Sequence, residues 1–207
     1  DRRSINAHET VHFIHSNYRN LNFKKTGVIN NCFFLNPNML YTAKEPKKFT
    51  KNQLSLSIPK EIREHRYQTY FIDNKDWNDR PLYIIDEWVA YINGSEVSID
   101  DFYNSRDNGV DKKYNVDDLF GPLELGVYSI YLCMMIEEKE PVLYTDEFKQ
   151  FINICLKRTD AILKGGSEIK QFKFNKQDMF YKTLREDIKT EPVRNHLNKY
   201  YNGILLQ

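Results

Sequence analysis

The sequence has few cysteines, no long apolar run and no excess of charge of either sign. Its three cysteines, Cys32, Cys133 and Cys155, are widely spaced and form no Cys-x-x-Cys pair, which argues against a disulfide framework and against a thiolate zinc site. Thirty basic residues face 29 acidic ones, so the net charge of +1 gives no electrostatic reason to expect nucleic acid as a partner. The longest apolar stretch, near Val127–Ile136, contains tyrosine and serine and is too short for a bilayer, so we predict no transmembrane segment.

The chain does have enough apolar and aromatic residues for a substantial core. Hydrophobic residues make up 41% of its 207 residues and aromatic residues 14%. A chain of this length and composition is typical of one folded domain or two small ones. We therefore predict a single domain over residues 1–207, with any internal subdivision in the turn-rich stretch near 104–116.

Helical patterns predominate, which predicts a mainly α protein with a small β element (α+β). Helices are expected over about 5–18, 60–70, 82–92, 98–103, 117–138, 146–163 and 177–188, and the tail from residue 192 is a further candidate. Asn93-Gly94 and Gly165-Gly166 are interpreted as helix ends. Short strands are expected within 28–43, as a hairpin or an edge strand, and 44–57 is expected to be a surface loop.

The most informative segment is HETVH at residues 8–12, an HExxH sequence. On a helix, residues four apart lie on one face, so the imidazoles of His8 and His12 can reach one metal ion. Glu9 lies about 100° around the axis, where it can touch a water on that metal and act as general base. Ser4 can cap such a helix, and no proline or glycine interrupts it. Zinc suits this donor set, and a catalytic zinc site needs a third protein ligand.

On these residues the sequence resembles the zincin metallopeptidases, over about fifteen residues. The longer metzincin pattern, HExxHxxGxxH, requires a glycine at position 15 and a histidine at position 18, where this chain has His15 and Tyr18. The resemblance therefore implies a gluzincin-like site, in which a glutamate on a later helix is the third ligand. It implies a Zn²⁺-dependent peptidase whose partner is a protein or peptide substrate.

Glu87 is the best candidate for that third ligand. It lies within a strongly apolar stretch, 82–92, where an unpaired charge would be expensive to bury. Tyr91, one turn later on the same face, is a candidate catalytic residue that would stabilise the oxyanion of the substrate. Asp86 points elsewhere and is a candidate for supporting a histidine ligand. In the alternative interpretation Glu87 pairs with Arg80 or Arg66, and Tyr91 is an ordinary core residue.

Other residues compete for a role in the site. Glu61, Glu64 and His65 occupy neighbouring turns of an expected helix and offer another metal-binding set, although such a run is more often a solvated helix face. His15 follows on the same stripe as His8, where it either supports the site or is simply a buried histidine.

The resemblance to zincins is incomplete, because only seven residues precede His8 here, whereas in zincins a sheet precedes the active-site helix. Either sequence upstream is missing, or the strands come later, at 32–35 and 39–43. An extended substrate can pair with the edge of such a strand. Trp77 and Trp88 are expected in the core or in the wall of a cleft.

Two alternatives to a peptidase stay open at this stage. One is a non-catalytic helical interaction module, which metal analysis would distinguish from an enzyme. The other is a metal-dependent hydrolase of a non-peptide amide or ester, which a closed pocket would favour over a long groove. The sequence does not indicate an oligomeric state.

Overall fold

The computed structural model describes residues 2–105, 117–172 and 176–207, and it confirms the predicted fold class. The main helices are α1 (Arg2–Thr26), α2 (Lys51–Ser57), α4 (Tyr83–Ser105), α5 (Asp117–Lys139), α6 (Asp146–Ser167), α7 (Gln177–Glu186) and α8 (Glu191–Tyr201). Single turns and short helices are η1 (Lys60–Ile62), α3 (His65–Tyr67), η2 (Gln68–Asp73), η4 (Pro141–Leu143), η5 (Lys170–Phe172) and η6 (Ile188–Thr190). Strands β1 (Asn31–Leu35) and β2 (Met39–Ala43) form an antiparallel hairpin.

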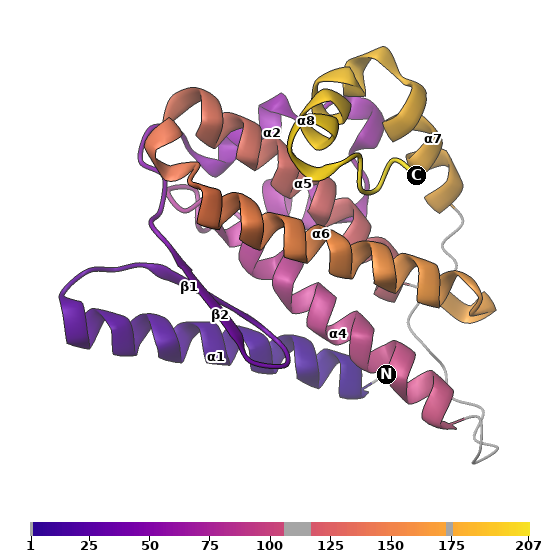
Figure 1. Cartoon of the computed structure of the whole chain (residues 1–207), viewed down its shortest axis with the longest axis horizontal. Helices are drawn as coiled ribbons and strands as arrows, with labels where there is room; N and C mark the ends of the chain where they lie inside the picture. The colour runs from indigo at the N-terminus through magenta and orange to yellow at the C-terminus, as the bar shows by residue number, and fades with distance from the viewer. Residues whose placement is uncertain (1, 106–116, 173–175) are drawn as a thin grey trace.

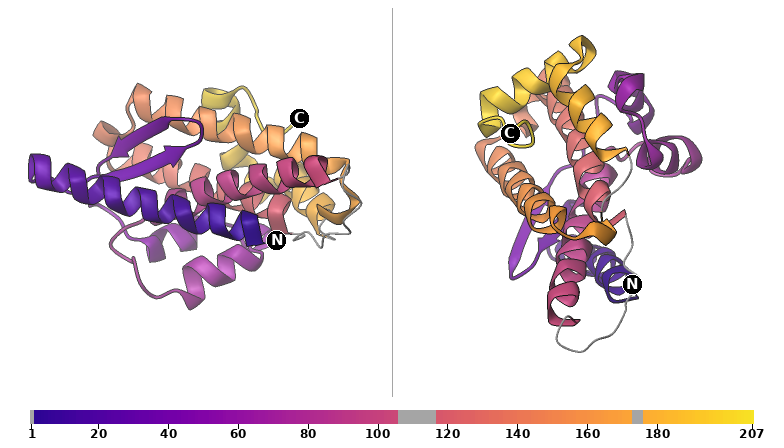
Figure 2. Two further views of the ribbon diagram at one scale, coloured as in Figure 1. Left: turned by 90° about the horizontal axis from the view of Figure 1, so that it is seen from below. Right: turned by 90° about the vertical axis from the view of Figure 1, so that its right-hand side faces the viewer.

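Helices α4, α6 and α8 pack around α5, and one hydrophobic cluster runs from Val11 in α1 to Leu205 near the C-terminus. Helix α1 lies along one side of the molecule, next to the hairpin and α4, while α7 and α8 lie at the opposite end (Figure 1; Figure 2, right). The subdivision expected near 104–116 falls outside the described residues, apart from 104 and 105, which belong to α4.

Helix α5 is apolar on all sides. Its segment Leu119–Lys139 is long and apolar enough to cross a membrane, yet 94% of its most apolar stretch is buried inside the fold. A helix that is apolar all round is either a core helix or a membrane span. Because α5 packs against α4, α6 and α8, its apolar composition is explained by its place in the core.

The helix end predicted at Asn93-Gly94 is wrong, because these residues make contacts between helices or between helix and strand. Helix α4 continues through Asn93 and Gly94 to Ser105. A Cβ at Gly94 would lie 3.1 Å from the Ser4 carbonyl oxygen, so glycine lets α4 approach α1. Helix α6 ends at Ser167, one residue after the predicted Gly165-Gly166, and Gly166 packs on Leu119 of α5. Gly94 thus marks close packing within a helix, and Gly166 combines close packing with a nearby helix end.

Helix α1 also runs further than expected, to Thr26. It ends at Gly27, whose φ of 70° is the left-handed conformation usual after a helix and whose N–H bonds the Phe23 carbonyl at 2.8 Å. The prediction of a continuous helix over 60–70 is wrong too, since η1, α3 and η2 divide it.

The segment predicted as a loop over 44–57 contains α2. Thr50 and Gln53 form a capping box at its start, a signal that is readable in the sequence. Lys51, fully buried, donates from its ammonium to the carbonyls of Asn74 (2.5 Å) and Asp76 (2.7 Å). This buried cation thereby fixes the loop that leads to Trp77.

The hairpin is attached to both α1 and α4 through one residue of β1. The Phe34 N–H donates to His15 Nε2 at 2.7 Å, and the Phe34 carbonyl accepts from Asn93 Nδ2 at 3.2 Å. Since both backbone groups of Phe34 face the helices, the outer edge of β1 is occupied there. The expectation that a substrate strand pairs with 32–35 is therefore wrong at this residue.

Candidate metal centre and cleft

Two helices bring the expected ligands together. His8 and His12 lie one turn apart on α1, and Glu87 faces them from the buried side of α4. The two Nε2 atoms are 3.1 Å apart, and Glu87 Oε2 lies 3.6 Å from His8 Nε2 and 3.5 Å from His12 Nε2. The three donor atoms thus form a nearly equilateral triangle.

The size of this triangle fits a zinc ion. Ligand atoms at 2.0–2.2 Å from a tetrahedral ion lie about 3.3–3.6 Å apart, close to the three observed distances. Glu87 Oε2 is buried and has no hydrogen-bond partner among the described residues. An orphaned carboxylate oxygen is costly inside a protein, and a divalent cation between these donors would satisfy it. His8, His12 and Glu87 are accordingly a candidate three-ligand set.

Asp86 supports this site from behind. One of its oxygens bonds His12 Nδ1 at 2.5 Å, and the other bonds His15 Nδ1 at 2.9 Å. A proton on His12 Nδ1 leaves the Nε2 lone pair free for a metal, as in the carboxylate–histidine–zinc arrangement. His15 is 1% exposed, and its Nε2 accepts from Phe34, so both of its ring nitrogens are used. His15 is a buried histidine that holds Asp86 in place.

The charges at the site are strongly coupled. Burial alone would raise the pKa of Glu87, but the facing rings of His12 and His8 lower that pKa to about 2. Asp86 behaves in the same way, and its pKa is lowered by hydrogen bonds from His12 and His15 despite burial. The same two carboxylates outweigh burial at His12 and raise its pKa to about 10. Without a metal these carboxylates favour a proton on His12; the same negative charges would compensate a bound cation.

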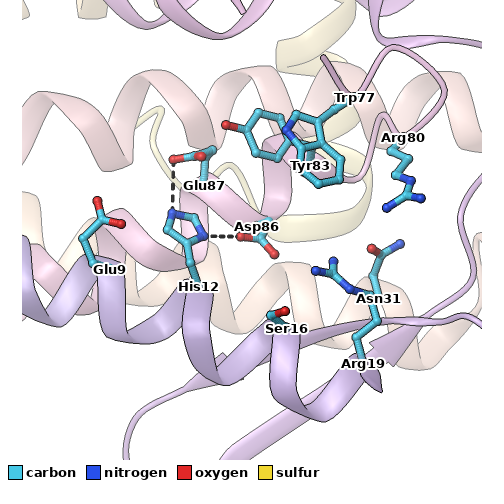
Figure 3. Close-up of a pocket in the computed structure, with 10 residues that line it drawn as sticks. All are labelled: Glu9, His12, Ser16, Arg19, Asn31, Trp77, Arg80, Tyr83, Asp86 and Glu87. Carbon is cyan, nitrogen blue, oxygen red and sulfur yellow. Dashed lines mark hydrogen bonds and ion pairs between the residues drawn. The ribbon is translucent and has the colours of Figure 1, made fainter. Parts of the chain in front are cut away.

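Glu9 is exposed and stands where two cavities meet. The larger, a cleft of about 450 Å³, extends from Glu9 and His12 along α1 to Arg19. The smaller, about 240 Å³, extends from Glu9 and His8 back to Ser4. Figure 3 shows the Glu9 carboxylate rising from α1 beside His12, at the edge of the larger cleft. This position, beside a ligand histidine and open to both cavities, suits a general base.

Three tyrosines surround the buried side of the site. Tyr91 packs edge-on against His8, with ring centroids 4.8 Å apart, and its hydroxyl lies 3.3 Å from that of Tyr70. Tyr83 points its hydroxyl toward Glu87 (Figure 3). Burial, and then the negative charge of Glu87, raise the pKa of both Tyr70 and Tyr83, so these phenols keep their protons. Tyr91 stays the predicted oxyanion donor, and no local sequence pattern had indicated Tyr70 or Tyr83.

The competing residues lie elsewhere among the described parts of the chain. Glu61 pairs with Lys189, and Glu64 pairs with Lys176 at 3.0 Å. Among the described residues, neither these two glutamates nor His65 lie close enough to the α1 histidines to bind one metal ion with them. Arg66, one of the alternative partners of Glu87, lies 3.8 Å from Glu124 instead.

The wall of the larger cleft contains residues that the sequence did not place there. Arg19 comes from α1, and Arg80 and Tyr83 come from the chain just before and at the start of α4. Trp77 lines the same cleft, in agreement with one of its two expected positions. Comparison with family models, with curated proteins and with solved structures finds no match for this chain. The assignment of this site therefore depends on its donor set and geometry.

Proposed function

We propose that this protein is a zinc-dependent metallopeptidase. The observation that supports this most directly is the triangle of His8 Nε2, His12 Nε2 and Glu87 Oε2, with an orphaned buried oxygen at one corner and Glu9 at the mouth of a cleft. A structural zinc site needs four protein ligands and no base, whereas three ligands and an adjacent carboxylate are typical of a catalytic site.

The proposed chemistry divides between the ion and the chain. A bound zinc ion would polarise the carbonyl of the scissile bond and lower the pKa of a water molecule to near neutral. Glu9 would accept the proton of the attacking water and deliver it to the leaving amine. Asp86 keeps the His12 ring in its orientation and tautomer. Tyr91 donates a hydrogen bond to the oxyanion of the substrate.

The shape of the cavities supports a peptide substrate over a compact small molecule. The two hollows share Glu9 and together follow α1 from Ser4 to Arg19. Fifteen residues of helix span about 22 Å, and an extended peptide covers that length with about six residues. The ligand triangle lies near the middle of this path, where the scissile bond of an extended chain belongs.

Metal content and hydrolysis test the proposal directly. The protein should retain close to one zinc per chain after purification without added zinc, measured by inductively coupled plasma mass spectrometry. The loaded protein should cleave members of a mixed peptide library detected by mass spectrometry. A chain without zinc and without measurable affinity for it would contradict the proposal and favour the interaction module.

The Glu9→Gln variant tests the role of Glu9 as general base without changing the proposed zinc ligands. The amide keeps the shape of the side chain but cannot accept the proton, so zinc content and fold should persist while hydrolysis falls at least about a hundredfold. Glu138→Gln, on an exposed glutamate of α5, is the matched control and should hydrolyse peptides like the parent protein. Full activity in Glu9→Gln would place the base elsewhere.

A further inference from the structure

The larger cleft is lined by opposite charges at its two ends. Glu9, Asp86 and Glu87 line the end near the ligand triangle. Arg19 and Arg80 line the other end, and Figure 3 shows their guanidinium groups on the far side of Asp86 from Glu9. Two cations from separate segments therefore face one space that also opens onto the proposed reaction centre.

Neither guanidinium is neutralised by a direct partner. Among the described residues, Arg19 and Arg80 form no ion pair and no side-chain hydrogen bond, and both are half-buried. The positive charge of Arg80 acts on the carboxyl group of Glu45 and lowers its pKa against the larger effect of burial. Its oxygens already accept from the Leu82 N–H at 2.8 Å and from Asn31 Nδ2 at 2.5 Å, and burial raises its pKa to about 7. Glu45 thus offsets only part of the positive charge.

An aromatic wall stands beside these arginines. Trp77 stacks on Tyr83, with centroids 5.5 Å apart and planes 16° apart, and the Arg80 guanidinium lies 5.3 Å from the Trp77 ring. Trp77 has a φ of 62°, a conformation that is rare for a bulky residue and frequent at functional sites. Its loop is held by the buried Lys51 ammonium. The fold thus holds an apolar surface and two unpaired cations together in the cleft.

We propose that Arg19 and Arg80 form a subsite for a carboxylate of the peptide substrate. This inference rests on the proposed peptidase function and adds its substrate class. Guanidinium groups bind carboxylates through paired, charge-assisted hydrogen bonds, and the Trp77–Tyr83 wall covers the apolar part of the same residue. The carboxylate belongs either to the free C-terminus of the substrate or to an acidic side chain.

The helix sets the distance between this subsite and the scissile bond. Arg19 follows His12 by seven residues, about 10 Å along α1. An extended peptide covers this distance with about three residues. The bound carboxylate therefore lies within about three residues of the cleaved bond.

Four forms of one neutral peptide test the subsite. The peptide is N-acetylated, contains alanine and phenylalanine, and is made as the C-terminal amide, as the free acid, and as amides with a single glutamate or glutamine moved along the sequence. The zinc-loaded protein should cleave one carboxylate form with a kcat/KM about tenfold or more above its neutral twin. Preference for the free acid identifies the C-terminus, and preference for glutamate identifies a side chain.

Variants of the arginines show which residues carry the preference. Arg19→Gln and Arg80→Gln should each reduce the ratio of carboxylate to neutral kcat/KM about tenfold, and Arg80→Lys should restore part of it. Lys24→Gln removes the same charge from an exposed position of α1 outside the cleft and should leave the ratio unchanged. Zinc content and thermal unfolding of each variant verify that the fold and metal site persist.

Measurements of peptide binding test the carboxylate subsite independently of the proposed peptidase function. In Glu9→Gln protein, calorimetry should show the free-acid or glutamate peptide binding about tenfold more tightly than its neutral twin, even if no peptide is hydrolysed. A protein that cleaves and binds both twins equally, or keeps its preference in both Arg→Gln variants, contradicts the carboxylate subsite alone. A protein that prefers carboxylate peptides but binds no zinc contradicts the peptidase and leaves the subsite standing.

Discussion

Two buried glutamates on neighbouring helices have opposite surroundings. Glu124 on α5 is fully buried, and its Oε1 accepts from the backbone N–H groups of Arg66 and Tyr67 and from the Tyr128 hydroxyl, at 2.9, 3.1 and 2.7 Å. Glu87 on α4 is 5% exposed, and its Oε2 faces two imidazole nitrogens without a hydrogen bond. Both glutamates keep one buried oxygen without a hydrogen bond among the described residues, but Glu124 Oε2 faces the Arg66 guanidinium, whereas Glu87 Oε2 faces two metal-binding nitrogens.

The pKa values of the two carboxyl groups are shifted in opposite directions. Burial raises the pKa of Glu124 to about 7, although Tyr128 and Arg66 oppose the shift. At Glu87 the two histidines outweigh burial and lower the pKa to about 2. Depth of burial alone therefore does not identify a functional carboxylate. What distinguishes Glu87 is an ionised oxygen that points at other metal-binding atoms.

The largest expected difference between the two glutamates is in zinc binding. Glu87→Ala removes one of three proposed ligands and should lower zinc affinity by about a hundredfold or more, and peptide hydrolysis by about a thousandfold. Competition with a fluorescent chelator measures the affinity. Glu124→Ala is the contrasting variant, and its folded fraction should bind zinc like the parent protein. Equal loss of affinity in both variants would contradict the distinction.

Stability should respond to both substitutions, through different groups. Glu124→Ala leaves two backbone N–H groups and a hydroxyl without their buried acceptor, which should cost about 3 kcal/mol in the free energy of unfolding. Urea unfolding of the metal-free protein measures this cost. Glu87→Ala removes the carboxylate that faces the His8 and His12 rings, and it should also destabilise the metal-free protein near neutral pH, because those rings hold the pKa of Glu87 at about 2.

The pH dependence of unfolding tests the raised pKa of Glu124. Its pKa is about 7 in the folded chain against 4.5 for the unperturbed group, so folding favours the protonated form. The contribution is complete below pH 4.5 and disappears as the pH rises through 7. Relative to Glu124→Gln, the parent protein should thus lose about 2 kcal/mol between pH 5 and pH 8. Parallel pH curves for the two proteins would show that the carboxyl group does not titrate in this range.

The smallest expected effect concerns the support of a ligand. Asp86→Asn keeps one acceptor but weakens the hold on His12, and should lower zinc affinity by about tenfold. Asp160→Asn, on an acid of α6 that pairs with Lys164 on the same helix, is the control and should leave zinc affinity unchanged. An Asp86→Asn protein with parental affinity would mean that packing alone orients the His12 ring.

The sequence predicted those parts of the site that follow from local periodicity. His8, Glu9 and His12 lie on one helix, and a carboxylate in an apolar stretch pointed to Glu87 as their partner. The contribution of Arg19 and Arg80 to one cleft depends on how α1 meets the chain before α4, which no local pattern encodes. The sequence therefore indicated the candidate ligand cluster but not the arginine-lined end of the cleft.

The fold shows the same division between local and long-range information. The helical class and the hairpin followed from residue patterns, whereas helix lengths were misjudged where glycine serves packing. Asn93 looked like a helix end, but its amide bonds the Val89 carbonyl within α4 and the Phe34 carbonyl in β1. The capping box of Thr50 and Gln53, by contrast, is a local sequence pattern that indicates the start of α2.

The separation of the ligands along the chain has a consequence for how the protein acquires its fold. Glu87 follows His12 by 75 residues, so no short segment can assemble the proposed centre by itself. During synthesis the two histidines emerge long before the carboxylate, and closing so long a loop carries an entropic cost that local contacts do not repay. The metal would then bind late, after α4 has docked on α1. It would link two helices that are far apart in the sequence and stabilise their contact.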